Sequence, residues 1–452
     1  MNTIFAQSSG RGKAGVTVYR ISGPSSLSAL EKLTSSQITE LQPRKMYLRT
    51  IFHPETGIQI DKALIVYFNA NSSFTGEESA EIHVHGSIAV IKLLNQALSL
   101  LDDLRVAEPG EFTKRAFLNG KFDLTAAEGL ADLIDAETEL QHKQAIRQLG
   151  GGLEVIYTNW RKQLLKIMSL IEAYIDFPDE EIPSEVLTHT KDNINNLCRE
   201  ISNHLRDNNR GERLRSGLKL AIAGKPNVGK SSLMNLLLKR EIAIVSNIAG
   251  TTRDVLEGHL DIGGYPIILQ DTAGIRDNSL DEIEQIGIKK SRDTLKHSDI
   301  KIIMYDVQEF NEKDITPFVD FIDDHTIVVF NKIDEVSGRD YNHSSMFMPH
   351  IPKHILYISA KTGKNIEKLM EHICQIAEQI ASPSENPQIT RERHRTQLSY
   401  AFASLSNLKL ENDLVLVAED IRITIRHLSN ITGVITVDEI LGEIFSNFCI
   451  GK

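Results

Sequence analysis

The middle of the chain contains the sequence Gly224-Lys225-Pro226-Asn227-Val228-Gly229-Lys230-Ser231. It fits the phosphate-binding pattern GxxxxGK[ST]; an apolar run, Leu218 to Ala223, precedes it and a helix-like run, Ser232 to Leu238, follows it. Glycines here let backbone amides curl around phosphate oxygens at a helix N-terminus, where the helix dipole favours an anion. The stretch therefore predicts a P-loop in which Lys230 reaches the β- and γ-phosphates and the Ser231 hydroxyl binds Mg²⁺.

Two further motifs follow strand-like runs downstream of the P-loop. Asp271-Thr272-Ala273-Gly274 comes after Ile267 to Gln270, where a carboxylate near Mg²⁺ and a glycine amide near the γ-phosphate are needed. Asn331-Lys332-Ile333-Asp334 closes the run Thr326 to Phe330. The carboxylate of Asp334 only accepts hydrogen bonds, so it can take the N1–H and 2-amino protons of guanine together, a donor pair that adenine lacks.

The remaining two motifs complete a GTPase set. Ser359-Ala360-Lys361 ends the last strand-like run and is expected to present backbone amides to the guanine carbonyl. Gly250-Thr251-Thr252-Arg253-Asp254 supplies a threonine for the switch between the first two motifs. Five motifs in the right order on the right elements predict a Ras-like P-loop GTPase that hydrolyses GTP.

One departure bears on the mechanism of hydrolysis. In Ras-like enzymes a glutamine that orients the attacking water follows the DxxG motif, whereas Ile275 stands at that position here. An apolar side chain cannot hold the water, so another group must. The nearest carboxylates are those of Asp277, Asp281, Glu282 and Glu284. From spacing alone each can equally be part of a solvated acidic segment, and Arg253 and Arg276 are better explained as surface or ion-pairing residues than as arginine fingers.

Strands and helices alternate over residues 216–380, which predicts a parallel sheet covered by helices. The predicted strands are Leu218 to Ala223, Ile267 to Gln270, Ile300 to Asp306, Thr326 to Phe330 and Ile355 to Ser359. We expect this domain to be inserted into a discontinuous helical domain, residues 120–215 and 381–452. Within it, helical spacing runs over Leu124 to Ile175 with a break at Gly150-Gly151-Gly152, over Leu187 to Leu214, and again from Arg391.

Residues 1–119 mix short strands with turns and are predicted to form an α+β domain. Val16 to Ile21, Ala63 to Phe68 and Glu81 to His85 are strand-like, and Ile88 to Leu104 has the apolar spacing of a helix. The chain as a whole is thus α/β and α.

Composition bounds the class of protein. A length of 452 residues suggests roughly three domains. Acidic residues outnumber basic ones by 61 to 50, a net charge of −11 that argues against a large, diffuse nucleic-acid-binding surface. Three distant cysteines offer neither a disulfide framework nor a zinc clip, and no apolar run is long enough for a membrane span. The start turns polar after Ile4-Phe5-Ala6, so we expect no signal peptide and a cytoplasmic protein.

Five stretches outside the nucleotide motifs are distinctive. They are Tyr19-Arg20-Ile21-Ser22-Gly23, Ser73-Phe74-Thr75-Gly76-Glu77, Pro109 to Lys121, Asp176-Phe177-Pro178-Asp179-Glu180-Glu181 and the final Cys449-Ile450-Gly451-Lys452. Through them the chain resembles, over essentially its whole length, the MnmE (TrmE) family of tRNA-modification GTPases. These matches are longer and more specific than the nucleotide motifs, which many families share.

The resemblance implies a GTP-dependent enzyme that works with the flavoprotein MnmG. Together they would add an aminomethyl or carboxymethylaminomethyl group to C5 of the wobble uridine of certain tRNAs, with a 5-formyl- or methylene-tetrahydrofolate as one-carbon donor. It also implies a homodimer formed through the N-terminal domain, a heterotetramer with MnmG, and GTP hydrolysis stimulated by K⁺.

The resemblance also assigns residues to the nucleotide and its metals. K⁺ would be held by Asn227 and Thr251 with the backbone of Ser246 and Ile248, while Thr252 joins Ser231 on Mg²⁺. Glu284 would position the water, so that Glu284 and Lys230 are the catalytic residues. A monovalent cation against the phosphates can supply the charge that an arginine finger would bring. The full nucleotide site would comprise Asn227, Val228, Gly229, Lys230, Ser231, Ser232, Ser246, Asn247, Ile248, Ala249, Gly250, Thr251, Thr252, Asp271, Thr272, Ala273, Gly274, Asn331, Lys332, Ile333, Asp334, Ser359, Ala360 and Lys361.

For folate, the matching positions are Arg20, Glu81, Lys121 and Lys452. A pterin presents an amidine-like N–H edge that a carboxylate such as Glu81 can accept bidentately, and the three cations suit carbonyl or glutamyl oxygens. Without the resemblance, each would be an ordinary surface charge. For Cys449 the resemblance suggests a nucleophile towards the uridine ring, but a packing residue or a folate-site residue accounts for it equally well, and we do not assign it a catalytic role.

Two alternative classes remain to be weighed against this one. A GTP-switched ribosome-assembly factor without chemistry of its own would share the nucleotide domain, but it calls for an RNA module such as a KH domain, and the flanks contain no such pattern. A membrane-associated GTPase lacks support because no span or basic amphipathic helix is found. The basic clusters Arg206-Arg210-Arg213-Arg215 and Arg391-Arg393-Arg395 can contact tRNA phosphates or be solvated helix faces.

Overall fold

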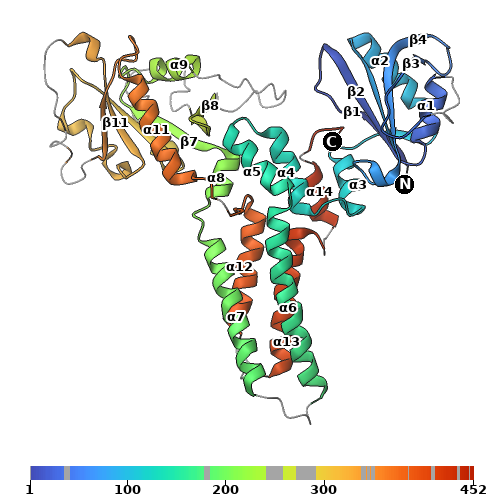
Figure 1. Ribbon diagram of the computed structural model, residues 1–452. Helices are drawn as coiled ribbons and strands as arrows, with labels where there is room; N and C mark the ends of the chain where they lie inside the picture. The colour runs from blue at the N-terminus through green and yellow to red at the C-terminus, as the bar shows by residue number, and fades with distance from the viewer. Residues whose placement is uncertain are drawn as a thin grey trace. The chain divides into compact units, whose positions relative to one another are not determined.

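The computed structural model describes residues 2–34, 41–177, 184–240, 258–270, 292–336, 343, 347, 352–384, 386–408, 413–434, 438–446 and 448–451. The chain divides into two compact units (Figure 1). The first unit comprises Met1–Ala131, Gln148–Glu180 and Glu411–Lys452; the second comprises Asp132–Arg147 and Glu181–Leu410.

The first unit contains a six-stranded sheet, counted over the described residues, in the order β3-β4-β5-β2-β1-β6. Its strands are β1 (Thr3–Gln7), β2 (Ala14–Ser22), β3 (Tyr47–Phe52), β4 (Gln59–Phe68), β5 (Ser79–Gly86) and β6 (Leu104–Val106). All neighbours are antiparallel except β1 and β6. Alternation along each strand sends residues such as Tyr19 and Ile82 to one face, where they pack against Leu30 of α1 (Ser26–Thr34) and Leu94 of α2 (Ile88–Ser99). The helices thus cover one face, and Arg20 and Glu81 stand on the other.

The helix expected over Ile88 to Leu104 is shorter than predicted. It ends at Ser99, and Leu104 begins β6. Between them Asp103 has φ +65°, a left-handed conformation immediately before β6, and its carbonyl accepts the amide of Thr3. The end of the predicted helix, at Leu104, therefore belongs to a strand that pairs with β1, although its apolar spacing suits a helix.

Helices make up the rest of the first unit. They are α3 (Glu111–Leu118), α6 (Gly152–Asp176), α13 (Leu414–Thr432), α14 (Asp438–Ser446) and the first part of α4 (Leu124–Asp135). Helices α6 and α13 lie side by side, each with a buried apolar stripe, and Arg161 Nε donates to Ser429 Oγ over 3.1 Å. Gly151 and Gly433 take left-handed conformations at the ends of these helices.

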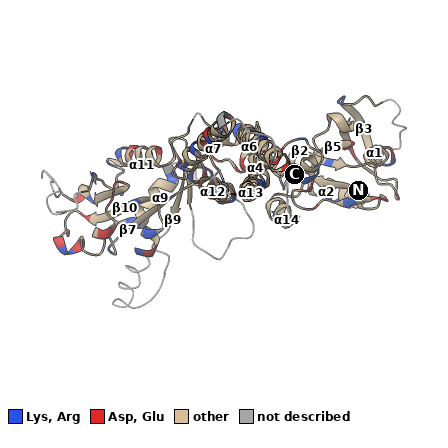
Figure 2. Cartoon of the chain, turned by 90° about the horizontal axis from the view of Figure 1, so that it is seen from below, with Lys and Arg blue, Asp and Glu red and all other residues tan. Residues whose placement is uncertain are grey.

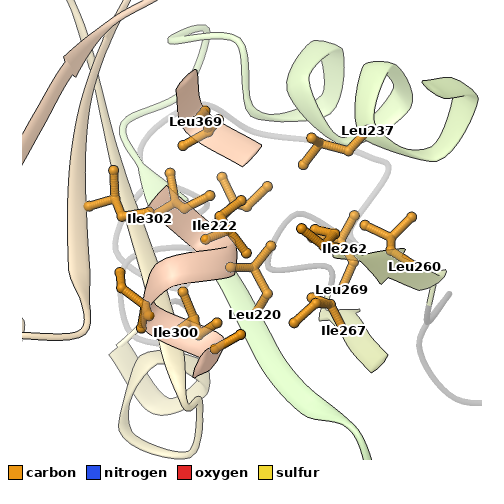
Figure 3. Close-up of a cluster of buried hydrophobic side chains, with 14 of the residues drawn as sticks. Leu220, Ile222, Leu237, Leu260, Ile262, Ile267, Leu269, Ile300, Ile302 and Leu369 are labelled. Atoms are coloured by element: carbon orange, nitrogen blue, oxygen red, sulfur yellow. The ribbon is translucent and has the colours of Figure 1, made fainter. Parts of the chain in front are cut away.

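The second unit contains a six-stranded sheet over the described residues, in the order β12-β11-β10-β7-β9-β8. The strands are β7 (Leu218–Gly224), β8 (Gly258–Ile262), β9 (Tyr265–Gln270), β10 (Ile300–Asp306), β11 (Thr326–Asn331) and β12 (His354–Tyr357). The five predicted strands pair in parallel as expected, and β8, which was not predicted, pairs antiparallel with β9. In Figure 3 Leu220, Ile222 and Ile302 pack with Leu237 of α9 (Lys230–Arg240) and Leu369 of α11 (Ile366–Ala381).

The remaining helices of the second unit flank this domain in sequence. They are α7 (Ser184–Leu205), α8 (Arg210–Ser216), α12 (Glu392–Ser406) and most of α5 (Glu139–Leu149). The single run expected over Leu187 to Leu214 is two helices, because Asn208 and Asn209 have φ of +55° and +58°. The run expected from Leu124 is also broken between α4 and α5, in addition to the break at the triple glycine. Short 3₁₀ turns cover Ala70–Ser72, Glu312–Asp314, Val319–Phe321 and Ile333–Glu335.

The α+β, helical and Ras-like α/β classes expected from the sequence are therefore present. The boundaries at 119/120, 215/216 and 380/381 stay a prediction, and α8 and α11 end close to two of them, at Ser216 and Ala381. Among the described helices none is long and apolar enough to cross a membrane. Figure 2 shows basic and acidic residues interspersed along the described chain.

Candidate functional site

The P-loop joins β7 to α9, and its glycines are required by close contacts. Gly224 has φ +150°, and a Cβ there would lie 2.3 Å from the carbonyl oxygen of Met304 on β10. Gly229 has φ +102°, and a Cβ there would lie 2.2 Å from Nδ2 of Asn331. Asn227 also has a positive φ, +63°. Only glycine tolerates the first two positions, so the loop has the tight curvature that an amide cradle for phosphate needs.

Lys230 closes the loop from the inside. It is the first residue of α9, and its Nζ donates to the carbonyl oxygens of Gly224 and Lys225 over 2.8 and 2.7 Å. The ammonium is thereby held over the mouth of the loop at a helix N-terminus, where a phosphate would meet both the charge and the backbone amides. Ser231 and Ser232 follow in the first turn of α9 with exposed side chains, so their hydroxyls are accessible to a metal ion or a phosphate.

Lys225 braces the loop from the outside. Its Nζ makes an ion pair with the carboxylate of Asp314, whose side chain is 6% exposed. Asp314 also accepts the amide of Asn311 over 3.1 Å as part of a capping box. Sequence reasoning did not select Asp314, because this residue lies far from the nucleotide motifs along the chain.

Asn331 connects the P-loop to the predicted base-binding turn. Its Nδ2 donates to the carbonyl oxygen of Val228 over 2.8 Å, and its Oδ1 accepts the amide of Ala360 over 2.9 Å. The side chain is buried, so both bonds are made away from water. The sequence placed Asn331 in a base-recognition motif, and the structure adds this bridging contact.

Lys332, Ile333 and Asp334 follow at the carboxyl end of β11. Lys332 has φ +68°, and its Nζ lies 2.6 Å from Oδ2 of Asp306; this hydrogen bond raises the pKa of Lys332. Asp334 is held ionised: a hydrogen bond from the Ser359 hydroxyl, and then the charge of Lys361, lower the pKa of its carboxyl. An ionised carboxylate at this edge of the sheet can only accept, as guanine recognition requires.

Residues Ser359 to Lys361 form a tight turn after β12. The carbonyl of Ser359 accepts the amide of Gly363 over 2.9 Å, and its Oγ accepts the amide of Thr362 over 3.0 Å. The Ala360 amide is engaged with Asn331. The structure therefore brings together Lys230, Asn331, Asp334 and this turn, which the sequence had assigned to one nucleotide site.

Several predicted site residues lie outside the described residues. They are Ser246 to Thr252, Arg253, Asp271 to Gly274, Ile275, Arg276, Asp277, Asp281, Glu282, Glu284 and Lys452. For the predicted Mg²⁺ and K⁺ the described donors are the Ser231 hydroxyl and the P-loop residue Asn227, whose hard oxygen atoms suit both ions.

A second cluster lies on the open face of the sheet in the first unit. Arg20 on β2 and Glu81 on β5 are register partners, and Nε and Nη2 of Arg20 lie 3.2 and 3.1 Å from Oε1 of Glu81. His83 Nε2 lies 3.2 Å from the other carboxylate oxygen of Glu81. The guanidinium carbon of Arg20 lies 5.4 Å from the ring centre of Phe74, a cation–π distance. Sequence reasoning did not select His83, although its place two residues after Glu81 on a strand puts both on one face.

Lys121, which follows α3, contacts the loop that carries Phe74. Its Nζ donates to the carbonyl of Asn71 over 3.1 Å, and a Cβ on Gly76 would lie 3.2 Å from its Cε. Phe74 lies between Asn71 and Gly76 in the sequence and packs on Arg20. Three of the four predicted folate residues thus gather around one loop.

The end of the chain returns to the first strand. Ser8 Oγ donates to the carbonyl of Gly451 over 2.9 Å, and Ile450 forms a β-bridge with Pro109. Gly451 has φ +99°, and a Cβ there would lie 2.2 Å from the carbonyl oxygen of Gln7. Strand β1 is the direct neighbour of the strand that bears Arg20. The Cys449 side chain is exposed.

Comparison with known proteins gives matches over nearly the whole chain. A family model described as the MnmE helical domain matches residues 124–449, and one described as the GTP-binding protein TrmE N-terminus matches residues 3–121. Curated relatives named tRNA modification GTPase MnmE from Rickettsia canadensis and Rickettsia akari are each 56% identical over 452 residues, covering all of both chains. One from Rickettsia typhi is 55% identical over the same length.

Solved structures match the chain over a smaller part. The G domain of the T. maritima FeoB iron transporter is 30% identical, covers 35% of this chain and 98% of its own, and has a TM-score of 0.27. Era from Aquifex aeolicus is 27% identical, covers 43% of this chain and 68% of its own, and has a TM-score of 0.27.

Proposed function

Because the chain belongs to the MnmE family of tRNA modification GTPases, we propose that its GTP hydrolysis drives modification of the wobble uridine of certain tRNAs. The partner in this reaction is the flavoprotein MnmG. The group added at C5 is an aminomethyl or carboxymethylaminomethyl group, and its one-carbon unit comes from a tetrahydrofolate derivative. The protein acts as a homodimer in the cytoplasm.

The arrangement around Asn331 carries the GTP part of this proposal. One buried amide ties the phosphate loop to the turn that follows β12, so the phosphate and base ends of a nucleotide would be held at a fixed separation. The ionised Asp334 selects guanine, and the Lys230 ammonium stabilises charge on the β- and γ-phosphates as the terminal bond breaks.

Potassium stimulation is supported by two residues. Ile275 cannot orient the attacking water, so Glu284 takes that role, and Asn227 offers an amide oxygen at the loop. Asn227, Thr251 and the backbone of Ser246 and Ile248 hold K⁺, while Ser231 and Thr252 hold Mg²⁺. The two cations supply positive charge against the phosphates, which an arginine finger would otherwise provide. GTP turnover in K⁺ is therefore expected to exceed turnover in Na⁺, and Glu284→Ala is expected to abolish turnover while GTP still binds.

The folate part is supported by the cluster around Glu81. The Glu81 carboxylate lies within hydrogen-bond distance of Arg20 and His83. Lys121 donates to the carbonyl of Asn71, in the loop that carries Phe74. Glu81 accepts the N–H edge of the pterin, and Arg20, Lys121 and Lys452 receive its oxygen atoms. Replacing Glu81 with alanine is expected to weaken binding of 5-formyltetrahydrofolate without changing GTP hydrolysis.

The decisive experiment is mass spectrometry of wobble uridines in tRNA from cells with and without the gene. The proposal expects the aminomethyl-type nucleosides to disappear and to return with the wild-type gene, but not with the Lys230→Ala or Glu81→Ala variants. Unchanged anticodon nucleosides would contradict the proposed modification and would favour a GTPase without chemistry of its own.

A further inference from the structure

A short helical segment, residues 132–147, is fixed to the β-hairpin of the nucleotide domain. His259 Nδ1 on β8 lies 2.8 Å from Oε2 of Glu137, and both side chains are largely screened from solvent, with 30% and 22% exposed. Leu140 packs against the apolar core beneath the sheet, and a Cβ on Gly264 would lie 3.3 Å from its Cγ. The segment therefore holds the hairpin at one strand and at its turn.

The same segment is also fixed to the helix that leads into the P-loop strand. Gln141 Nε2 donates to the carbonyl of Arg215, and Gln144 Nε2 to that of Gly211, each over 3.0 Å. Asp132 lies 2.6 Å from Arg391 and 3.7 Å from Arg215. Because α8 runs directly into β7, residues 132–147 have a fixed position relative to the P-loop as well as to the hairpin.

The hairpin has a particular place in the chain. It begins at Gly258, six residues after Thr252, and it ends at Gln270, immediately before Asp271. Its turn is Gly263-Gly264, with φ of +63° and +88°, which is the geometry of a tight two-residue turn. The two strands are paired in register through this turn, so a change in the position of β8 is expected to shift β9 as well.

We propose that Glu137 and His259 are positioning residues for GTP turnover. Their hydrogen bond fixes the hairpin, which lies in the sequence between Thr252 and Asp271, whose metal roles belong to the proposed function on which this inference rests. Helices α4 and α5 both continue past residues 132–147 into the first unit. Residues 132–147 therefore connect the hairpin, along the chain, with the unit that carries the folate cluster.

The test is steady-state GTP turnover by the full-length protein with Glu137→Ala, His259→Phe and the double variant. Each single variant is expected to lower kcat roughly fivefold, the factor that one ordinary hydrogen bond is worth. The KM for GTP should stay within about twofold because Lys230, Asn331 and Asp334 keep their partners. The double variant should be no slower than either single one, and Glu137→Gln, which keeps an acceptor oxygen, should retain most of the activity.

The matched control is Glu139→Ala, two residues further on, which removes an exposed ion pair with Lys143. It should leave kcat unchanged. The inference is overturned if the single variants keep full kcat, if their losses add in the double variant, or if the control loses as much. Failure of the proposed function would look different, because the wild-type protein would then show no K⁺ stimulation or no tRNA modification.

The readout that distinguishes coupling from local damage is the number of GTP molecules hydrolysed per modified uridine. With MnmG and tRNA present, Glu137→Ala is expected to raise this ratio at least about twofold. A ratio equal to that of the wild type, together with a lower kcat, would confine Glu137 to the nucleotide domain and overturn the coupling.

Discussion

At the scale of single residues, two lysines hold the P-loop from opposite sides. Lys230 binds the carbonyl of Lys225 from within, while the Lys225 side chain pairs with Asp314 outside the loop. The backbone at Lys225 is therefore fixed by two electrostatic contacts that share one residue. Asp314 is buried and accepts the backbone amide of Asn311, so its carboxylate is fixed in place. Lys225, with the longer and more exposed side chain, is the movable partner.

Removing the Lys225 charge is expected to loosen the loop. Lys225→Met should weaken GTP binding about fivefold, which corresponds to about 1 kcal/mol for a partly exposed ion pair. In a double-mutant cycle with Asp314→Asn, the coupling energy for GTP affinity should also be about 1 kcal/mol. Isothermal titration provides the affinities. Arg292 and Asp320, a more exposed pair in the same unit, serve as control and should show little coupling; equal coupling in both pairs would contradict the role of Asp314.

Which residues of the site could be predicted depends on how their geometry is encoded. Lys230 and Asp334 belong to motifs whose spacing along the chain fixes their place at a strand or helix end, so the sequence assigned them directly. Asp314 and His83 act through contacts that depend on the fold: Asp314 lies in the 3₁₀ turn after β10 and pairs with Lys225 of the P-loop, and His83 shares a sheet face with Glu81. The two-residue period of a strand could have indicated His83, whereas the contact of Asp314 with Lys225 can be recognised only in the folded chain.

At the scale of elements, Asp123 immediately precedes α4 and is half-buried. Its Oδ1 accepts the amide of Ala126 over 2.8 Å and both carboxylate oxygens receive the Thr125 hydroxyl. Burial raises the pKa of Asp123 to about 6, although these hydrogen bonds act in the opposite direction. The folded state therefore disfavours the ionised form, and the stability linked to this group is present below about pH 4 and is lost as the pH rises through 6.

Asp123→Asn is expected to keep the cap and remove that pH dependence. Relative to the variant, the wild type should lose about 2 kcal/mol of stability between pH 4.5 and pH 7.5. Calorimetry of both proteins at the two pH values gives the difference, in which the titration of all other groups cancels. If the difference in free energy of unfolding between wild type and variant were the same at both pH values, ionisation of Asp123 would not destabilise the folded state.

Helix α7 carries the opposite case in the second unit. Burial lowers the pKa of His204 to about 4, with Arg395 and His394 acting in the same direction and Asp207 against them. The neutral form is favoured in the folded state, so the associated stability is complete above about pH 6.5 and is lost as the pH falls towards 4. Between pH 7 and pH 4.5 the free energy of unfolding of His204→Gln should therefore fall by about 2 kcal/mol less than that of the wild type.

The exposed His189 on the same helix provides the control for this measurement. Thermal unfolding of His189→Gln, followed by circular dichroism, should show the acid dependence of the wild type. If His204→Gln also kept it, another buried group would have to account for the loss of stability in acid.

Element boundaries could be predicted less well than element types. The parallel strands and the long helices were expected, because their apolar periodicity extends over many residues. The break at Asn208-Asn209 and the end of α2 depend on left-handed residues and on pairing with β1, which are choices between competing backbone partners. The hairpin β8–β9 was missed even though Gly263-Gly264 is a turn signal, since each of its strands is short.

At the scale of the whole molecule, the chain closes on itself within the first unit. Residues 8 and 451 are joined by a hydrogen bond, so the last residues complete a domain that begins at the first strand. This closure could be proposed from the family resemblance but not from periodicity, because four residues have no pattern. The closure brings Gly451 to the end of β1, the strand that pairs with the Arg20-bearing β2.

Gly451 is the residue on which this closure depends. Its φ of +99° is unfavourable for any side chain, and a Cβ would meet the carbonyl of Gln7 at 2.2 Å, so Gly451→Ala must displace the end of the chain. We expect affinity for 5-formyltetrahydrofolate to fall roughly tenfold, because Lys452, one of the proposed folate residues, directly follows Gly451 in the chain, while kcat for GTP stays within about twofold. Gly442→Ala is the matched control, since a Cβ there meets nothing within 4 Å. Folate binding measured by fluorescence titration and GTP turnover on the same samples separate the two sites. Equal folate affinity in both variants would mean that the closure serves stability alone, and that Arg20, Glu81 and Lys121 suffice for the ligand.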